Sequence, residues 1–315
     1  MGEANGHVPD VLVLIGPTAS GKSAVAYELA QHLGGEILSA DSMQGYREVP
    51  LLTQQPPRAW QADIPHHFIA CRSVTETWSA ADFRRAALRV IADIRARGKF
   101  PIIVGGTGLY IRALLDGLCD APPAQPAIRA RLLEEIATLG VETLHARVQA
   151  SDPVAAITMH PRDARRIIRA LEVLEATQQP LSTRWRAASS APPPWSFRLV
   201  GLAHPREVLY QRINARAEQM FADGVVEEVR QLQQQPLSHT ASQIIGLQLV
   251  REHLRQQRPL ADTMHRLQQQ TRRYAKRQLT WFRREPRIQW LACAQHAPAD
   301  LASRIAHHVV DASSA

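Results

Sequence analysis

The chain has 315 residues, which is long enough to bury a sizeable core, and we expect one large domain with an insertion, or two domains. Hydrophobic residues make up 45% of it and charged residues 21%, which is ordinary for a soluble protein. The net charge is +8 and nearly all the basic residues are arginines. That balance suits a polyanionic partner, although a GC-rich genome produces the same bias.

Neither the cysteines nor the apolar segments indicate secretion, a zinc site or a membrane. Cys71, Cys119 and Cys293 lie far apart without metal-ligand spacing, which predicts a reducing compartment and no zinc. Residues 1–10 are polar and lack the apolar core of a signal peptide, and no apolar run approaches membrane-spanning length. We therefore expect a soluble, cytoplasmic protein that does not associate with membranes.

The first predicted unit is a buried strand at residues 11–15, a glycine-bounded turn and a helix of strong helix formers. The turn fits the P-loop pattern G-x-x-x-x-G-K-[ST] in the strand–turn–helix context that this pattern requires. Its glycines let successive N–H groups point at an anion, and the helix N-terminus adds to the positive field. The alternative is an ordinary turn with a surface lysine. We expect a di- or triphosphate to bind at Gly16, Pro17, Thr18, Ala19, Ser20, Gly21, Lys22 and Ser23, with the Ser23 hydroxyl on Mg²⁺.

Polar residues follow the next two predicted strands. Asp41 directly follows the strand predicted at 36–40. An acid beside a P-loop is suited to coordinate Mg²⁺ or to accept a proton. The alternative role for Asp41 is that of a helix N-cap. The strand at 100–104 runs into a second glycine-rich turn at 105–110, where backbone can approach a ligand and Thr107 offers a hydroxyl. Alternating strands and helices predict an α/β fold with a parallel sheet covered on both faces.

Between these strands the sequence predicts a loop at 48–65 and a helix at 79–96 that is capped by Ser79. His66 and His67 are adjacent and would point to different faces of a regular element. No third ligand has matching spacing, so we do not expect a metal there.

Proline clusters at 120–126 and 192–194 interrupt the alternation, and residues 127–178 show only helical patterns. We therefore predict a first part of the core at 1–122, a helical insertion domain at 123–192, and a second part of the core at 193–315. Within the insertion, Arg162, Arg165, Arg166 and Arg169 share one helix face with little acidic compensation. This face is suited to a phosphate backbone, and the alternative is a solvated charged face.

After a strand at 197–202, helices are predicted at about 205–235, 241–256 and 260–284. Arg212 and Arg216 lie one turn apart and either reach a phosphate or are solvated. The last helix carries a basic stripe with Tyr274 and Trp281 beside it. Aromatic rings interleaved with arginines suit nucleic acid, and the alternative places Trp281 in the core.

Six motifs stand in a fixed order along the chain. They are Gly-Pro-Thr-Ala-Ser-Gly-Lys-Ser at 16–23, Ala-Asp-Ser-Met-Gln at 40–44, Pro-His-His at 65–67, Gly-Gly-Thr-Gly-Leu-Tyr at 105–110, Arg-Arg-Ile-Ile-Arg-Ala-Leu-Glu-Val at 165–173 and Lys-Arg-Gln-Leu-Thr-Trp-Phe-Arg at 276–283. Together they resemble the tRNA dimethylallyltransferases, also called tRNA isopentenyltransferases, the IPP transferase family. The resemblance covers about residues 11–290.

The resemblance implies a P-loop kinase-like fold with an all-helical insertion. It implies transfer of a dimethylallyl group from dimethylallyl diphosphate to the exocyclic amine (N6) of the adenosine 3′-adjacent to the anticodon, with Mg²⁺. The partners would be the tRNA anticodon stem-loop and the diphosphate, and we expect a monomer. Asp41 would be the general base, and Thr107 and Lys22 would complete the catalytic group. The residues implied to contact tRNA are Asp41, Ser42, Met43, Gln44, Thr107, Arg129, Arg165, Arg166, Ile167, Ile168, Arg169, Gln243, Gly246, Gln248, Lys276, Arg277, Gln278, Thr280, Trp281 and Arg283.

The chain departs from the family pattern in two places. Residues 48–56 keep only Thr53 and Pro56 of the usual Gly-Met-Asp-Ile-Gly-Thr-Ala-Lys-Pro, which loses an acid and a lysine. The usual Ile-Gly-Tyr-Lys is Ile-Gly-Leu-Gln at 245–248, which loses an aromatic ring and a charge. We expect an altered contact to tRNA but not a lost reaction.

Three other functions are compatible with parts of the sequence. A small-molecule P-loop kinase explains the P-loop but not the basic stripes. An adenylate isopentenyltransferase acting on free nucleotides has little use for the basic helix of the insertion. A non-enzymatic RNA-binding protein does not explain Asp41 beside a complete P-loop.

Overall fold

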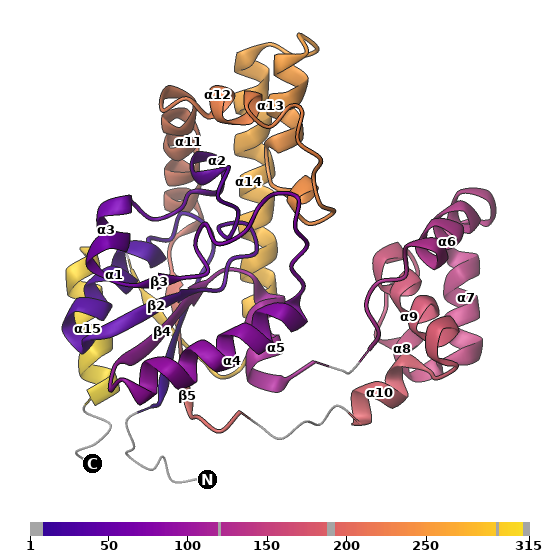
Figure 1. Ribbon diagram of the computed structural model, residues 1–315, viewed down its shortest axis with the longest axis horizontal. Helices are drawn as coiled ribbons and strands as arrows, with labels where there is room; N and C mark the ends of the chain where they lie inside the picture. Colours follow the sequence, from indigo (N-terminus) through magenta and orange to yellow (C-terminus); the bar gives the residue numbers. More distant parts are fainter. Residues whose placement is uncertain (1–8, 119–120, 188–192, 294–295, 311–315) are drawn as a thin grey trace. The chain divides into compact units, whose positions relative to one another are not determined.

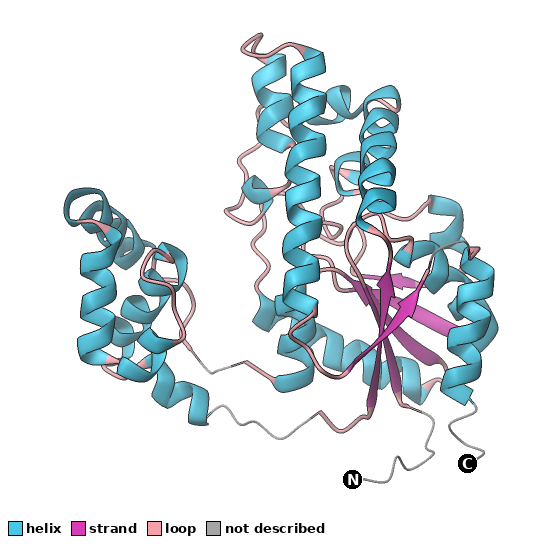
Figure 2. Ribbon diagram, turned by 180° about the vertical axis from the view of Figure 1, so that it is seen from behind, coloured by secondary structure: helices cyan, strands magenta, loops and turns pink. Residues whose placement is uncertain are grey.

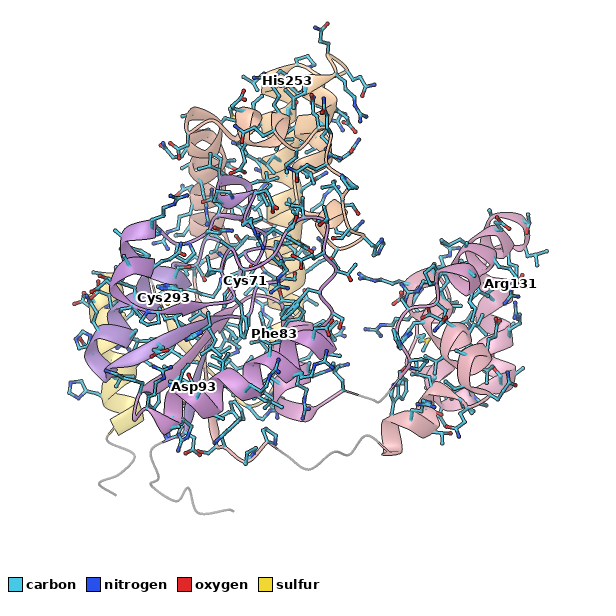
Figure 3. All side chains as sticks on the ribbon, viewed as in Figure 1. Cys71, Phe83, Asp93, Arg131, His253 and Cys293 are labelled. Atoms are coloured by element: carbon cyan, nitrogen blue, oxygen red, sulfur yellow. The ribbon has the colours of Figure 1, made fainter. Side chains whose placement is uncertain are left out.

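The computed structural model describes residues 9–118, 121–187, 193–293 and 296–310 (Figure 1). The chain divides into two compact units. The sheet unit comprises Met1–Leu115 and Pro193–Ala315, and the helical unit comprises Asp116–Pro192. The helical unit begins seven residues before the predicted start of the insertion at 123. Of the three cysteines, Cys71 is exposed and Cys293 is buried (Figure 3), and both are free, whereas Cys119 lies outside the described residues.

The sheet unit is built on a six-stranded parallel sheet, drawn in magenta in Figure 2. Its strands are β1 (Val11–Ile15), β2 (Gly35–Ser39), β3 (His66–His67), β4 (Phe100–Gly105), β5 (Phe197–Ala203) and β6 (Ile288–Ala292), in the order β3-β2-β4-β1-β5-β6. In register, Ile15 lies opposite Gly105, and Ser39 lies opposite Val104. The turns that follow β1, β2 and β4 therefore meet at one edge of the sheet.

Both faces of the sheet are buried, because alternate side chains of β1 enter different cores. Val11, Val13 and Ile15 pack with α4 (Ala80–Ala96) and α5 (Gly108–Asp116), where Phe83 is also fully buried. Leu12 and Leu14 pack with α1 (Lys22–Leu33) and α15 (Pro298–Val310). The predicted α/β fold with a doubly covered parallel sheet is confirmed. Ser79 caps α4 as predicted, in a capping box with Asp82.

Most of the remaining helices of the sheet unit surround a third core that includes Tyr46, Val229 and Leu267. They are α2 (Pro50–Thr53), α11 (Arg206–Ala222), α12 (Val225–Arg230), η1 (Ala241–Gln243), α13 (Leu247–Leu254) and α14 (Leu260–Phe282). The short helix α3 (Arg58–Asp63) instead stacks its Trp60 ring on Tyr27 of α1.

Three predictions in this region were wrong. The helix expected at 205–235 breaks at Gly224, which has a left-handed backbone with φ of 96°. The helix expected at 241–256 breaks at Gly246, whose φ is 88°. The loop expected at 48–65 contains α2 and α3. The N-terminus of α2 is capped from far along the chain, because the Glu228 carboxylate accepts from the amides of Leu51 and Leu52 at 2.7 and 2.8 Å.

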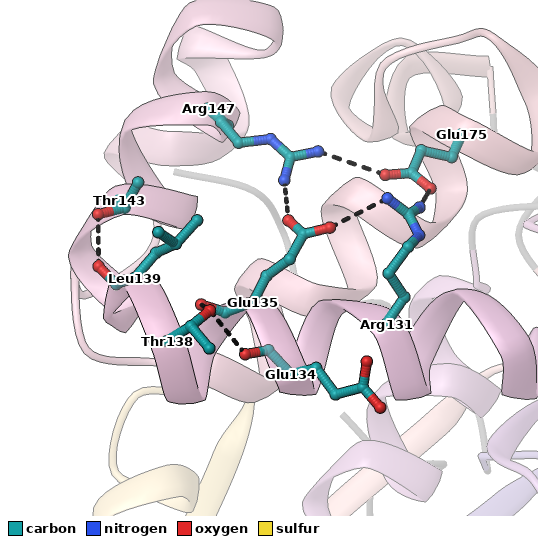
Figure 4. A network of polar contacts seen from close by, with 8 residues as sticks. All are labelled: Arg131, Glu134, Glu135, Thr138, Leu139, Thr143, Arg147 and Glu175. Atoms are coloured by element: carbon teal, nitrogen blue, oxygen red, sulfur yellow. Dashed lines mark hydrogen bonds and ion pairs between the residues drawn. The ribbon is translucent and has the colours of Figure 1, made fainter.

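The helical unit contains α6 (Pro126–Leu139), α7 (Val141–Ser151), α8 (Pro153–Ile157), α9 (Ala164–Thr177) and α10 (Leu181–Ala187). These helices pack around an apolar core that includes Leu132, Leu144 and Leu171. Arg131 and Arg147 form ion pairs with Glu135 and Glu175, which link α6, α7 and α9 at the surface of the unit (Figure 4). Within the described segments of both units, no helix is long and apolar enough to cross a membrane.

Candidate active site

The P-loop folds over the carboxyl end of β1 and ends within the first turn of α1. Ala19 and Gly21 both adopt left-handed backbone conformations, with φ of 64° and 84°, and α1 starts directly afterwards at Lys22. A Cβ at Gly16 would lie 2.9 Å from the Ser20 hydroxyl oxygen, so the first glycine lets the loop fold back tightly. The result is a helix N-terminus without a side-chain cap, which is the arrangement that binds anions.

Two cations lie beside this loop. Burial lowers the pKa of Lys22 to about 8, and the nearby Arg216 guanidinium contributes to the decrease, whereas Asp41 opposes it. The Lys22 ammonium donates to the Pro17 carbonyl at 2.7 Å. Burial likewise lowers the pKa of Arg216 to about 10, again against the charge of Asp41. The sequence alone did not decide whether Arg216 contacts a phosphate or is solvated. The structure brings it to the P-loop, where two partly buried cations favour an anionic ligand.

Asp41 lies in a turn at the end of β2, next to the second glycine-rich turn. One of its carboxylate oxygens accepts from the Met43 amide at 2.9 Å. The next helix begins only at Pro50, so the alternative that Asp41 caps a helix is wrong. The Thr107 hydroxyl accepts from the Ser42 amide at 3.1 Å and ties the turn after β4 to the turn after β2.

Two tyrosines complete the surroundings of Asp41. Burial raises the pKa of the Tyr110 and Tyr274 hydroxyls, and the charge of Asp41 acts in the same direction on both. Neighbouring Thr107 and Gln278 side chains act in the opposite direction on the pKa of Tyr274. The charge of Asp41 thus acts on two cations and two phenols, Lys22, Arg216, Tyr110 and Tyr274, which places this carboxylate in a polar environment near the P-loop.

The C-terminal half of α14 carries an open hollow of about 330 Å³, lined by Lys276, Arg277, Thr280, Trp281 and Arg284. Trp281 also packs against the sheet core, and the Arg112 guanidinium lies 5.5 Å from its ring centroid. Trp281 therefore packs against the core on one side and lines the hollow on the other, so each of the two predicted roles is partly right. Arg283 is exposed next to this hollow. A basic surface with an accessible ring is suited to nucleic acid.

Other predicted tRNA contacts in the sheet unit differ in exposure. Gln243 and Gln248 are exposed, whereas Gly246 is buried against Leu267 and Leu52. Leu247, at the position of the family's tyrosine, is only 1% exposed and packs in the third core. The side chain at 247 therefore points into the protein, and the expected change in the tRNA contact at 247–248 stays a prediction.

Side-chain hydrogen bonds connect the atypical segment 48–56 to neighbouring parts of the site. The Gln55 amide donates to the carbonyls of Gln44 and Tyr46 at 2.9 and 2.8 Å. Gln54 accepts a hydrogen bond from the Arg216 guanidinium. The residues that replace the family pattern thus hold the Asp41 turn and orient one of the cations of the site.

In the helical unit, the expectation that the arginine stripe at 162–169 has little acidic compensation is wrong. Arg162 pairs with Glu142, Arg166 with Asp163, and Arg169 with Glu172. Within the described part of the chain, Arg165 is the member of this stripe that forms no ion pair with a carboxylate. Glu142 lies on another helix, so its contribution was not visible in the periodicity of α9.

Glu172 joins two of the predicted tRNA contacts. Its carboxylate is fully buried and accepts from Arg129 at 2.7 Å, Arg169 at 2.6 Å and the Gln125 amide at 2.6 Å. Burial alone would raise the pKa of Glu172, but these hydrogen bonds lower it. Ile167 and Ile168 pack in the core of the unit, so of the predicted contacts at 165–169 the exposed Arg165 is the best placed to reach a partner.

A parallel sheet with a P-loop at the end of β1 defines the P-loop class of α/β proteins. The profile of the IPP transferase family matches residues 44–285, and the chain belongs to this family. The tRNA dimethylallyltransferase of Geobacter metallireducens is 45% identical over 283 residues, which cover 89% of this chain and 92% of the relative. The tRNA dimethylallyltransferase of Myxococcus xanthus is 43% identical over 293 residues, which cover 93% and 95%.

Solved structures agree with this assignment. The full-length tRNA isopentenylpyrophosphate transferase from Bacillus halodurans superposes with a TM-score of 0.69 at 32% identity, over 97% of this chain and 98% of that protein. A eukaryotic dimethylallyltransferase acting on tRNA superposes with a TM-score of 0.78 at 27% identity, over 94% and 77%.

Proposed function

We propose that this protein transfers the dimethylallyl group of dimethylallyl diphosphate to N6 of the adenosine that is 3′-adjacent to the anticodon in tRNA. The observation that carries the proposal is the combination of a P-loop with a carboxylate, Asp41, at one site. A phosphate cradle binds the donor, and a base beside it serves a reaction in which the acceptor must lose a proton. The names of the relatives, which are tRNA dimethylallyltransferases, support the transferred group and tRNA as the acceptor.

The P-loop is proposed to hold the diphosphate as a leaving group. Its backbone amides, the N-terminus of α1, Lys22 and Arg216 all present positive charge at the place where negative charge accumulates as the C–O bond breaks. Arg216 adds to the residues expected from the sequence. Stabilisation of the departing charge is the main contribution that these groups make, because the allyl cation needs no covalent help from the protein.

Asp41 is proposed to act as the general base. The N6 lone pair forms a bond to C1 of the dimethylallyl group, the C1–O bond to the diphosphate breaks, and Asp41 accepts the proton that N6 loses. One of its oxygens accepts a hydrogen bond from the Met43 amide, which orients the carboxylate, while the other oxygen stays available for the proton. Thr107, which ties the two turns together, keeps this geometry next to the cradle.

The residues at the P-loop fit a Mg²⁺ ion. The Ser23 hydroxyl lies in the first turn of α1, one residue after Lys22, and oxygen ligands are those that Mg²⁺ prefers. When bound, the ion would add positive charge at the diphosphate. We propose Ser23 as its protein ligand.

The tRNA is proposed to contact the exposed basic side chains of both units. In the sheet unit these include Lys276, Arg277 and Arg283, with Trp281 as a stacking ring. In the helical unit Arg165 is exposed, and the half-buried Arg129, which pairs with Glu172, is also proposed as a contact. Enzymes that modify a stacked base remove it from the stack at a cost of about a few kcal/mol, which such contacts offset. We propose that the protein acts as a monomer in the cytoplasm.

The experiment that tests the proposal supplies radiolabelled dimethylallyl diphosphate to the purified protein with one of three acceptors. These are total tRNA from a strain that lacks the modification, free AMP, and a set of small molecules with labelled ATP as a second donor. We expect label in tRNA only. Label in AMP would identify an adenylate isopentenyltransferase, and phosphorylation of a small molecule would identify a kinase, and either result without label in tRNA would overturn the proposal.

A further inference from the structure

We propose that Gln278 is a positioning residue of the diphosphate cradle and does not contact tRNA, although it lies within the motif on α14 that is otherwise assigned to the RNA. Its carboxamide joins the P-loop to the second glycine-rich turn. The inference rests on the proposed function in one respect, namely that the P-loop holds the diphosphate.

The side chain of Gln278 bridges two backbone groups that are far apart in the sequence. Its Oε1 accepts from the Thr18 amide at 2.8 Å, and its Nε2 donates to the Gly106 carbonyl at 3.0 Å. The residue is only 5% exposed and lies on the buried face of α14 with Ala275 and Phe282. A buried polar group is retained at such a position when its hydrogen bonds are satisfied, as they are here.

The chemistry of the two partners requires a carboxamide at this position. An amide N–H on one side needs an acceptor and a carbonyl on the other side needs a donor, and glutamine offers one of each. A glutamate has the same shape but would direct an oxygen at the Gly106 carbonyl. It would also bring a negative charge to the loop that binds an anion. A methionine has a similar length and offers neither strong hydrogen bond.

The glycines of the second turn show how closely α14 approaches. A Cβ at Gly106 would lie 2.1 Å from Gln278 Nε2 and 3.3 Å from the Gly16 carbonyl oxygen. A Cβ at Gly108 would lie 2.2 Å from the Nε1 atom of Trp281. The glycines therefore allow α14 to pack closely against this turn. Gln278 links the turn to the P-loop through its two hydrogen bonds.

The groups of α14 that are suited to RNA lie on another face. Lys276 and Thr280 are two residues before and after Gln278, which places them about 160° away at 3.6 residues per turn. Both are exposed, whereas Gln278 is buried. One stretch of helix thus presents a surface for a partner on one side and holds the phosphate cradle on the other.

The experiment compares Gln278→Met and Gln278→Glu with the wild type and with Gln270→Met as a matched control. Gln270 is exposed on the same helix, eight residues earlier. Calorimetry measures the Kd for inorganic pyrophosphate with Mg²⁺, and filter binding measures the Kd for an unmodified tRNA anticodon stem-loop. Thermal melting reports whether each variant is folded, and Gln278→Glu serves as the test if the methionine variant is not.

We expect both Gln278 variants to bind pyrophosphate about tenfold more weakly and to bind the stem-loop within twofold of the wild type. The methionine variant loses both hydrogen bonds, whereas the glutamate variant loses the bond to the Gly106 carbonyl and adds a negative charge beside the P-loop. The control should change neither constant. An unchanged pyrophosphate Kd, or a loss of stem-loop affinity as large as the loss of pyrophosphate affinity, would overturn the proposal. Pyrophosphate binding does not depend on prenyl transfer, so a failure of the proposed reaction leaves this test intact.

Discussion

The lowered pKa of Lys22 predicts that the affinity of the site for a diphosphate falls as the pH rises above 7. Burial sets this pKa at about 8, so the ammonium is about nine-tenths protonated at pH 7 and about one-tenth protonated at pH 9. Only the charged form attracts the diphosphate, whose own last pKa is near 6 and is already passed. Between pH 7 and pH 9 the affinity should therefore decrease about tenfold.

The assay is calorimetric titration with a non-reactive thio analogue of dimethylallyl diphosphate at pH 7, 8 and 9. Lys22→Met is the control, and it should bind more weakly at every pH and show a nearly flat profile. Arg216 does not interfere, because its pKa of about 10 keeps it charged through this range. A flat profile for the wild type, or the same decrease in the methionine variant, would refute the assignment of this pKa to Lys22 at the diphosphate.

The same pKa has a consequence for stability that can be measured without ligand. Unfolding returns Lys22 from about 8 to its ordinary value of 10.5, so between these pH values the unfolded chain binds more protons than the folded one. The contribution of Lys22 to the free energy of unfolding therefore rises with pH across this window. Urea titrations measure the free energy of unfolding of both proteins. The value for the wild type minus the value for Lys22→Met should increase from pH 8 to pH 10. A constant difference would contradict the lowered pKa.

Three further predictions concern catalysis, RNA binding and packing. Asp41→Asn should reduce single-turnover transfer by about 10²–10⁴-fold and leave the tRNA Kd unchanged, whereas a loss of tRNA binding would mean that Asp41 is only positional. Arg165→Ala should reduce the slope of log K against log salt for tRNA binding by about 0.7–0.9. The control Arg131→Ala, which removes an arginine that is paired with carboxylates, should leave this slope nearly unchanged. Equal slopes for Arg165→Ala and the wild type would exclude a phosphate contact at Arg165. Gly108→Ala should lower the free energy of unfolding by about 1–3 kcal/mol and shift the fluorescence of Trp281, because the new Cβ overlaps its ring, and an unchanged protein would show that α14 can move away.

The parts of the fold that were predictable are those whose signal is local. The strand β1 is a continuous apolar run, and the P-loop that follows it is a fixed pattern of glycine, lysine and serine. Strands β3 and β6 were missed, because β3 has two residues and β6 exposes three of its five side chains without regular alternation. The breaks at Gly224 and Gly246 were present in the sequence, but a single glycine inside a helical pattern is ambiguous.

The parts of the site that were not predictable depend on contacts between distant segments. Arg216 could only be placed at the P-loop once α11 was positioned, and its spacing from Arg212 was the single local signal. Gln278 lies in a motif whose neighbours face solvent, so its inward direction needs the packing of α14. Glu172 belongs to the motif at 165–173, but its burial between Arg129 and Arg169 depends on the packing of the whole helical unit.

The central claim is that the P-loop holds a leaving group while the carbon chain moves. The most direct test uses dimethylallyl diphosphate that carries ¹⁴C in the prenyl group and ³²P in the diphosphate, with unmodified tRNA and Mg²⁺. We predict that ¹⁴C enters tRNA at the adenosine 3′-adjacent to the anticodon and that ³²P is released as pyrophosphate in equal amount. Transfer of ³²P to any acceptor, or release of pyrophosphate without ¹⁴C in tRNA, would contradict the claim.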